Sequence, residues 1–315
     1  MITVSVPAKI HLLGEHSVVY GKPALLAAIN RRISVTIKPS KTKIIQGCKG
    51  YEKEIGNLLH VLERAIMEET KIKKIKSYSI KINSQIPVRA GLGSSAALSA
   101  AFTAGLLSFL DVPWDKKTIF KIAYAGETFF HGNPSGGDLA IVIEGGFLWF
   151  RKEFEFLKTF SILPFKLHEN IKQFVLINSG KPEESTKELV ENVSKLKIAF
   201  PKKAQSIFNS QEELTKRMVI ALRDGNEDNF IECIKFGEKN LEELGVVGKK
   251  AQTIIRGVEE LGGAAKISGG GGIKKGSGML LAYHKDMGKI INYVKQNNLE
   301  LLSIKIEEKG LKINE

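Results

Sequence analysis

The chain has 315 residues, of which 43% are hydrophobic and 26% are charged, and its formal net charge is +13 at pH 7. This length exceeds one ordinary hydrophobic core of about 150 residues, so we expect two lobes, each with its own core. The hydrophobic content excludes an intrinsically disordered chain. No apolar run approaches the roughly 20 residues that a membrane span requires.

The basic excess consists mostly of lysine interspersed with glutamate, as in residues 52–54 and 307–309. Such mixed runs are typical of solvated surfaces and differ from the basic patches with stacking aromatics that bind nucleic acid. Cys48 and Cys233 lie far apart and in no metal-ligand spacing, which favours neither a disulfide framework nor a zinc site. The N-terminus lacks the charged start and apolar run of a signal peptide. We therefore predict a cytoplasmic protein that binds neither nucleic acid nor membranes.

The first half of the chain combines short strands with helices. The small and apolar run at residues 95–110 predicts a helix that is buried on nearly every side. Residues 116–129 predict a second helix, whose stripe at helical spacing includes Glu127. The strands predicted in this half span residues 1–6, 33–37, 78–82 and 139–143.

The second half begins with a strand and continues mainly with polar amphipathic helices. The predicted strands span residues 174–178, 279–283 and 301–306. The predicted helices span residues 185–223, with a break near Pro201, and residues 226–243, 247–260 and 286–296. Because strands and helices mix without strict βαβ alternation, we predict an α+β protein with lobes at residues 1–168 and 169–315.

The most informative glycine-rich stretch is Gly91-Leu92-Gly93-Ser94-Ser95, which opens the small-residue helix. Glycines let backbone N–H groups converge on an anion, and a helix N-terminus adds unpaired N–H groups and the positive end of a dipole. The stretch matches neither GxxxxGK[ST] nor GxGxxG, so it favours neither a P-loop NTPase nor a Rossmann dehydrogenase. It predicts a phosphate site with a serine as candidate Mg²⁺ ligand, and a tight turn with a serine N-cap is the alternative.

A second stretch, residues 7–21, places Lys9 after the first strand and Glu15 and His16 directly after a glycine. A lysine beside a transferred phosphoryl group neutralises developing charge. Glu15 and His16 are candidates for hydrogen bonds to a polyhydroxylated or carboxylated ligand. Taken alone, such a lysine is more often a surface residue and such a histidine more often a turn residue.

A third stretch, residues 131–138, ends in Asp138. An aspartate in a glycine-proline loop is either an ordinary turn residue or a held general base. Glu127 lies eleven residues earlier on a predicted helix and offers a second carboxylate. One carboxylate can therefore ligate Mg²⁺ while the other accepts a hydroxyl proton.

These three stretches, in this order, resemble the GHMP kinase superfamily. The resemblance covers the whole chain and includes a further glycine run at residues 265–272, AKISGGGG. The pairing of GEHSVVYG at residues 14–21 with HGNPSGGD at residues 131–138 is most similar to the branch that phosphorylates mevalonate. The resemblance implies an ATP-dependent and Mg²⁺-dependent kinase that phosphorylates the primary hydroxyl of mevalonate in isoprenoid biosynthesis. It also implies an N-terminal lobe like the second domain of ribosomal protein S5 and a C-terminal ferredoxin-like lobe, and a homodimer is compatible with it.

The same resemblance implies roles for matching positions. Asp138 matches the catalytic base or orienting residue, and Lys9 matches its partner beside the γ-phosphoryl group. Ser95 and Glu127 match the Mg²⁺ ligands. The ATP-binding positions are Pro87, Arg89, Ala90, Gly91, Leu92, Gly93, Ser94, Ser95 and Ala96. The substrate-binding positions are Glu15, His16, Ser135, Thr186 and Gly270.

Two features depart from the family pattern. Ala8 stands where the family usually has glycine, and residues 273–278, with Lys274 and Lys275, separate the last glycine run from the next strand. The added lysines would suit an already phosphorylated acceptor, so a related kinase acting on phosphomevalonate, on the 3-hydroxyl of mevalonate or on a sugar is an alternative. A non-catalytic ligand-binding protein of the same fold is another, although the lysine, aspartate, serine and glutamate that it would lose are all present.

Overall fold

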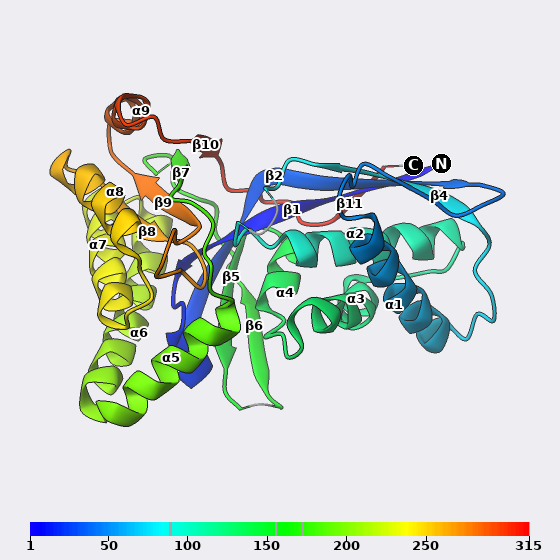
Figure 1. Cartoon of the computed structure of the whole chain (residues 1–315), viewed down its shortest axis with the longest axis horizontal. Coiled ribbons are helices and arrows are strands. Elements are labelled where there is room, and N and C mark those ends of the chain that lie inside the picture. The colour runs from blue at the N-terminus through cyan, green and yellow to red at the C-terminus, as the bar shows by residue number, and fades with distance from the viewer. Residues whose placement is uncertain (88–89, 155, 172, 315) are drawn as a thin grey trace.

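A computed structural model describes residues 1–87, 90–154, 156–171 and 173–314. Helices and strands are arranged as two sheets with helices packed against each of them (Figure 1). Arg89, one of the predicted ATP-binding positions, lies outside the described residues.

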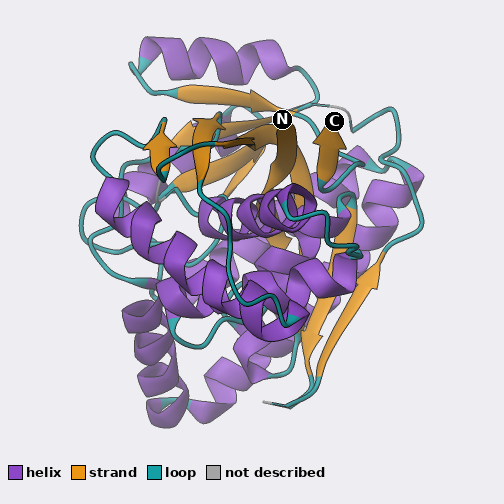
Figure 2. Cartoon of the chain, turned by 90° about the vertical axis from the view of Figure 1, so that its right-hand side faces the viewer, coloured by secondary structure: helices purple, strands orange, loops and turns teal. Residues whose placement is uncertain are grey.

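Within the described residues, seven strands form the first sheet, in the order β11-β1-β2-β4-β3 with β5 joined to β2 and β6 joined to β5. Neighbouring strands are antiparallel except for β3 and β4. The strands are β1 (Ile2–Leu13), β2 (Pro23–Pro39), β3 (Ile44–Gln46), β4 (Tyr78–Ser84), β5 (Phe147–Lys152), β6 (Lys158–Ile162) and β11 (Lys312–Asn314). Because β11 pairs with β1, the two ends of the chain lie close together (Figure 2).

The helices against the first sheet are α1 (Glu52–Thr70), α2 (Ser94–Phe109), α3 (Lys116–His131) and α4 (Gly137–Glu144). The predicted burial of α2 is confirmed, since residues 96–107 are all buried. Small side chains allow α2 to pack closely against β1, β2 and α3. This packing fixes the N-terminus of α2 beside β1.

The strand predicted at residues 139–143 is wrong, because this segment is part of helix α4. All five residues are buried, so the run lacks the polar positions that distinguish a helix from a buried strand. Gly136 and Gly145 bound the helix, each with a φ of 85° that favours glycine. As a consequence, Asp138 lies in the first turn of a helix, where the dipole stabilises a negative charge.

The second sheet has the antiparallel order β10-β7-β9-β8 in the described part of the chain. Its strands are β7 (Phe174–Asn178), β8 (Ala264–Ile267), β9 (Met279–Tyr283) and β10 (Leu301–Ile304). The accompanying helices are α5 (Thr186–Ala199), α6 (Pro201–Asp224), α7 (Glu227–Glu243), α8 (Lys249–Glu260) and α9 (Met287–Gln296). The predicted break is confirmed, because Pro201 begins α6, a position that needs no N–H donor.

The α+β class is confirmed, while several elements extend beyond their predictions. Strand β1 continues to Leu13, so Lys9 lies within it, and helix α1 had no counterpart in the prediction. The division of the chain between residues 168 and 169 stays a prediction. None of the helices in the described ranges combines the length and the apolar composition that crossing a bilayer requires.

Candidate active site

Lys9 and Asp138 form an ion pair between β1 and the first turn of α4. Lys9 is 3% exposed, and its Nζ lies 3.0 Å from Oδ2 of Asp138. Desolvation alone would raise the pKa of Asp138, but the charge of Lys9 and the contact with His11 lower it well below its usual value. Asp138 is therefore an ionised, oriented carboxylate, and about 35% of its side chain remains open to a ligand.

His11 approaches the same carboxylate and was not among the predicted site residues. Its Nε2 lies 3.4 Å from Oδ1 of Asp138. Side chains two positions apart on a strand point to the same face, so Lys9 and His11 share one side of β1. A prediction that continued the first strand past residue 6 would have placed His11 on the same face as Lys9.

The predicted phosphate loop lies directly against Lys9. The backbone N–H of Lys9 donates to the carbonyl of Leu92 at 3.0 Å. Gly93 precedes α2 with a φ of 72°, and a Cβ at this position would lie only 2.7 Å from Cγ of Lys9. The fold therefore brings the start of the chain and the glycine loop together at the N-terminus of α2, where helix N–H groups lack intrahelical acceptors.

Ser95 and Glu127 are neighbours beside this ion pair. Glu127 is 3% exposed on α3 and close enough to Ser95 for that side chain to affect its pKa, and Oγ of Ser95 lies 3.0 Å from Nε2 of His131. Burial and the charge of Asp138 raise the pKa of Glu127 to about 7, although Ser95 and Lys9 act in the opposite direction. Its Oε1 is buried and has no hydrogen-bond partner among the described residues.

This arrangement fits a hard divalent cation. A carboxylate oxygen that is buried without a partner, next to a hydroxyl oxygen, is the donor chemistry that Mg²⁺ prefers. The described residues contain no group of three or more His, Cys, Asp or Glu that could hold a metal by themselves. Phosphate oxygens and water would therefore supply the remaining ligands, as they commonly do for Mg²⁺.

Glu15 belongs to a buried charge cluster between the sheets. It forms an ion pair with Lys266 of β8, whose Nζ also donates to the carbonyl of Ile267. Glu238 of α7 accepts from the N–H of Ile267 at 2.9 Å, and burial raises its pKa to about 8, although Lys266 acts in the opposite direction. Lys266 and Glu238 were not predicted as site residues, although Lys266 stands within the AKISGGGG motif.

His16, Gly270 and Thr186 meet at the glycine run of the second sheet. Nε2 of His16 lies 2.9 Å from the carbonyl of Gly270, and burial lowers the pKa of His16. A Cβ at Gly270 would lie 3.2 Å from both Cγ2 and Oγ1 of Thr186, so these two residues are in close contact. Ser135 lies apart from them, exposed on the loop before α4, where its Oγ accepts from the N–H of Gly137 at 3.2 Å.

The added residues of the glycine segment bind a neighbouring loop. The carboxylate of Glu184 accepts from the N–H groups of Ile273 and Lys274 at 3.1 and 3.2 Å. The exposed Lys275 donates to Glu183 at 2.6 Å. The charge of Lys275 is therefore already partnered within the chain.

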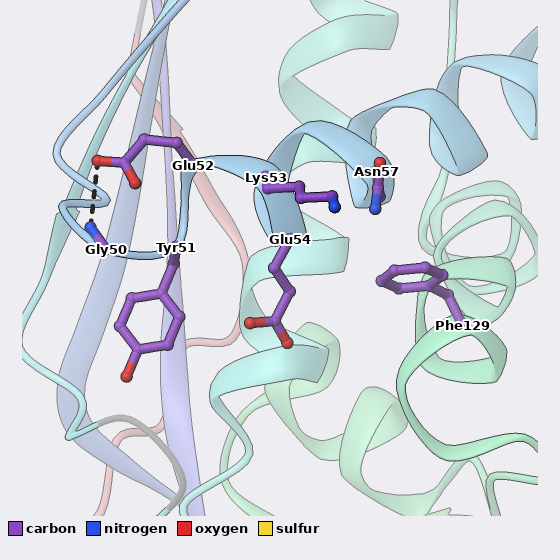
Figure 3. Close-up of a pocket in the computed structure, with 7 residues that line it drawn as sticks. All are labelled: Gly50, Tyr51, Glu52, Lys53, Glu54, Asn57 and Phe129. Carbon is purple, nitrogen blue, oxygen red and sulfur yellow. Dashed lines mark hydrogen bonds between the residues drawn. The ribbon is translucent and has the colours of Figure 1, made fainter.

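A cavity of about 360 Å³ lies between the start of α1 and the end of α3 (Figure 3). The aromatic side chains of Tyr51 and Phe129 lie on opposite sides of it, with 38% and 40% of each residue exposed. Phe129 belongs to the last turns of α3, as Glu127 does, although side chains two positions apart on a helix do not share a face. The lining residues are Gly50, Tyr51, Glu52, Lys53, Glu54, Asn57 and Phe129.

Solved structures share this fold. The mevalonate kinase of Methanococcus jannaschii matches with a TM-score of 0.81 at 20% identity, over 97% of this chain and 98% of that chain. A galactokinase of Lactococcus lactis, solved with galactose, matches with a TM-score of 0.74 at 16% identity, over 99% and 95%. Residues 57–146 also match the family model of the GHMP kinases N terminal domain. The solved structures show the fold, and the family match assigns residues 57–146 to the GHMP kinases.

Curated relatives narrow the class. The chain is 33% identical to a mevalonate kinase of Archaeoglobus fulgidus, over 85% of this chain and 88% of the relative. It is 30% identical to a mevalonate kinase of Thermococcus sibiricus, over 100% and 98%. The chain therefore belongs to the mevalonate kinase family of the GHMP kinase superfamily.

Proposed function

We propose that the chain transfers the γ-phosphoryl group of ATP to the primary hydroxyl of mevalonate, giving 5-phosphomevalonate for isoprenoid biosynthesis. The relatives named above support the acceptor. The observation that carries the reaction class is the Lys9–Asp138 ion pair, held beside the glycine loop at the N-terminus of α2. At this place the lysine can neutralise charge on the transferring phosphoryl group, and the aspartate can accept a hydrogen bond from the acceptor hydroxyl.

The nucleotide extends from the glycine loop toward α3. Residues 91–95 and the first N–H groups of α2 bind the phosphates, because a helix N-terminus favours an anion. The cavity between α1 and α3 receives the base, supported by its two partly exposed aromatic side chains and by the amide of Asn57 (Figure 3).

Ser95 and Glu127 would hold Mg²⁺, which supplies positive charge to the phosphate oxygens when it is bound. The unpartnered Oε1 of Glu127 supports this role, since a bound cation would compensate the buried carboxylate. The Mg²⁺ dependence of the reaction belongs to this proposal.

Asp138 orients the acceptor hydroxyl by accepting its hydrogen bond. A carboxylate with a lowered pKa is a weak base, and it suffices because the nucleophile keeps its proton until late in a loose phosphoryl transfer. Asp138 then takes the proton and releases it to solvent, while Lys9 neutralises charge on the transferring oxygens. No covalent enzyme intermediate is required.

The acceptor lies against His16, Gly270 and Thr186, and Ser135 stays a predicted contact. The buried Glu15 acts from behind this surface, since its ion pair with Lys266 links β8 to the segment that carries His16. A cytoplasmic location, a homodimer and the division into lobes at residues 168 and 169 stay predictions.

A coupled ADP-release assay over mevalonate, phosphomevalonate, homoserine and galactose tests the proposal. We expect the highest kcat/KM with mevalonate. A preference for another acceptor would refute the substrate assignment, and ATP binding without any transfer would indicate a non-catalytic binding protein. Because Lys275 pairs with Glu183, it offers less positive charge to an already phosphorylated acceptor than the sequence suggested.

A further inference from the structure

His11 approaches the second oxygen of the Asp138 carboxylate. Lys9 Nζ lies 3.0 Å from Oδ2, and His11 Nε2 lies 3.4 Å from Oδ1. Each oxygen of the carboxylate therefore has its own nitrogen partner from β1. A carboxylate held at both oxygens keeps one plane, whereas a carboxylate held at one oxygen can rotate about its Cβ–Cγ bond.

The surroundings of His11 select one tautomer of a neutral ring. Burial, together with the positive charge of Lys9, lowers the pKa of His11, although Asp138 and Glu15 act in the opposite direction. Because Nε2 faces an ionised carboxylate, the hydrogen of the neutral imidazole belongs on Nε2.

The other ring nitrogen indicates that packing alone does not explain His11. Nδ1 is buried and has no hydrogen-bond partner among the described residues. A buried acceptor without a partner lowers stability, and an aliphatic side chain at the same place would avoid that loss. The contact with Asp138 is therefore the feature of the ring that an aliphatic residue could not provide.

The backbone of His11 connects this contact to the second sheet. Its N–H donates to Oγ of Ser268 at 3.1 Å, and Ser268 is buried directly before the glycine run at residues 269–272. The pairing of β1 with β2 also shifts its register between His11 and Leu13, an irregularity that re-aims neighbouring side chains. The position of the ring thus depends on both sheets.

We propose that His11 is a positioning residue, whose neutral Nε2–H donates to Oδ1 of Asp138 and, with Lys9 on Oδ2, fixes the carboxylate plane toward the acceptor hydroxyl. The inference rests on the proposed phosphoryl transfer, because it deepens the role of Asp138 in that reaction. His11 makes and breaks no covalent bond, and it acts through Asp138.

Steady-state kinetics of His11→Leu and His11→Gln test the inference. His11→Leu should lower kcat by about 10- to 100-fold, because a small misplacement of a catalytic group has effects of this size. The KM values for ATP and mevalonate should stay within about threefold, since ground-state binding is unaffected. His11→Gln should recover most of kcat, because the amide is an uncharged donor that can reach Asp138.

The exposed His60 gives the matched control, and His60→Leu should leave kcat unchanged. Unchanged kcat in His11→Leu, or equal losses in both His11 variants, overturns the inference.

Coupling to Asp138 separates positioning from a general structural role. In single-turnover experiments, His11→Leu should not lower the rate constant further on an Asp138→Asn background. If the two residues acted independently, the two losses in rate would multiply. Nitrogen NMR of the wild-type ring should show a hydrogen on Nε2, and a hydrogen on Nδ1 overturns the inference. The NMR spectrum of the ring can be recorded without turnover. It therefore tests the role of His11 even if no acceptor is phosphorylated, an outcome that would refute the proposed function instead.

Discussion

Replacing Gly93 by alanine tests whether the contact between the glycine loop and Lys9 sets the rate. The added Cβ would lie 2.7 Å from Cγ and 3.2 Å from Cε of Lys9. An ordinary contact needs about 3.5 Å, so the lysine side chain must move by roughly 1 Å. Moving Nζ from 3.0 Å to about 4 Å from Asp138 loses about 1.4 kcal/mol at an effective dielectric of 20, which is about tenfold. Misplacement of the reacting groups adds to this, and we expect kcat to fall by about 10- to 100-fold.

The matched control is Gly245→Ala. Gly245 has a φ of 73°, against 72° for Gly93, and nothing lies within 4 Å of its added Cβ. Both variants should therefore lose a similar stability of about 1 kcal/mol from left-handed backbone strain, seen as a similar drop in Tm. The coupled ADP-release assay gives kcat and KM for both. A kcat for Gly93→Ala within about twofold of the control would refute the argument from the Lys9 contact.

Two further predictions concern buried carboxylates. Glu127→Gln should raise the Mg²⁺ concentration for half-maximal activity by about tenfold or more, and an unchanged Mg²⁺ titration would contradict the assignment of the ligand. Burial raises the pKa of Glu238 to about 8 from its ordinary value of 4.5, so the folded state holds this proton more tightly than the unfolded state. The stability that it contributes is fully present below pH 4.5 and is lost as the pH rises through about 8. Glu238→Gln should therefore reduce the drop in Tm between pH 5.5 and pH 8.5. Thermal unfolding of the variant and the wild type at both pH values measures this drop. Equal drops would contradict the raised pKa of Glu238.

The sequence predicted the residues that carry local motifs. Gly91 to Ser95 have the composition of an anion-binding turn, and Glu127 followed from helical spacing, because both signals depend on neighbouring residues alone. The structure places them near Lys9 and Asp138, as the predicted site requires.

The sequence could not predict features that depend on tertiary contacts. Residues 139–143 are apolar throughout, and nothing in such a run shows whether it is buried as a strand or as a helix. Lys266 looked like one of many lysines, and only its ion pair with Glu15, 251 positions away, distinguishes it. His11 was missed for a related reason, because its role depends on a strand that extends further than the sequence pattern indicated.

The pairing of β11 with β1 determines how the second sheet is attached. The chain leaves the first sheet after β6, builds the second sheet, and returns to the first sheet at β11. The second sheet is thus an insertion that is covalently connected to the first sheet at both of its ends. Ser268 and Gly270, which follow β8 of the second sheet, contact His11 of β1 and His16. Two tethers limit the number of relative orientations that the sheets can sample, so less entropy is lost when the halves of the site come together around a ligand.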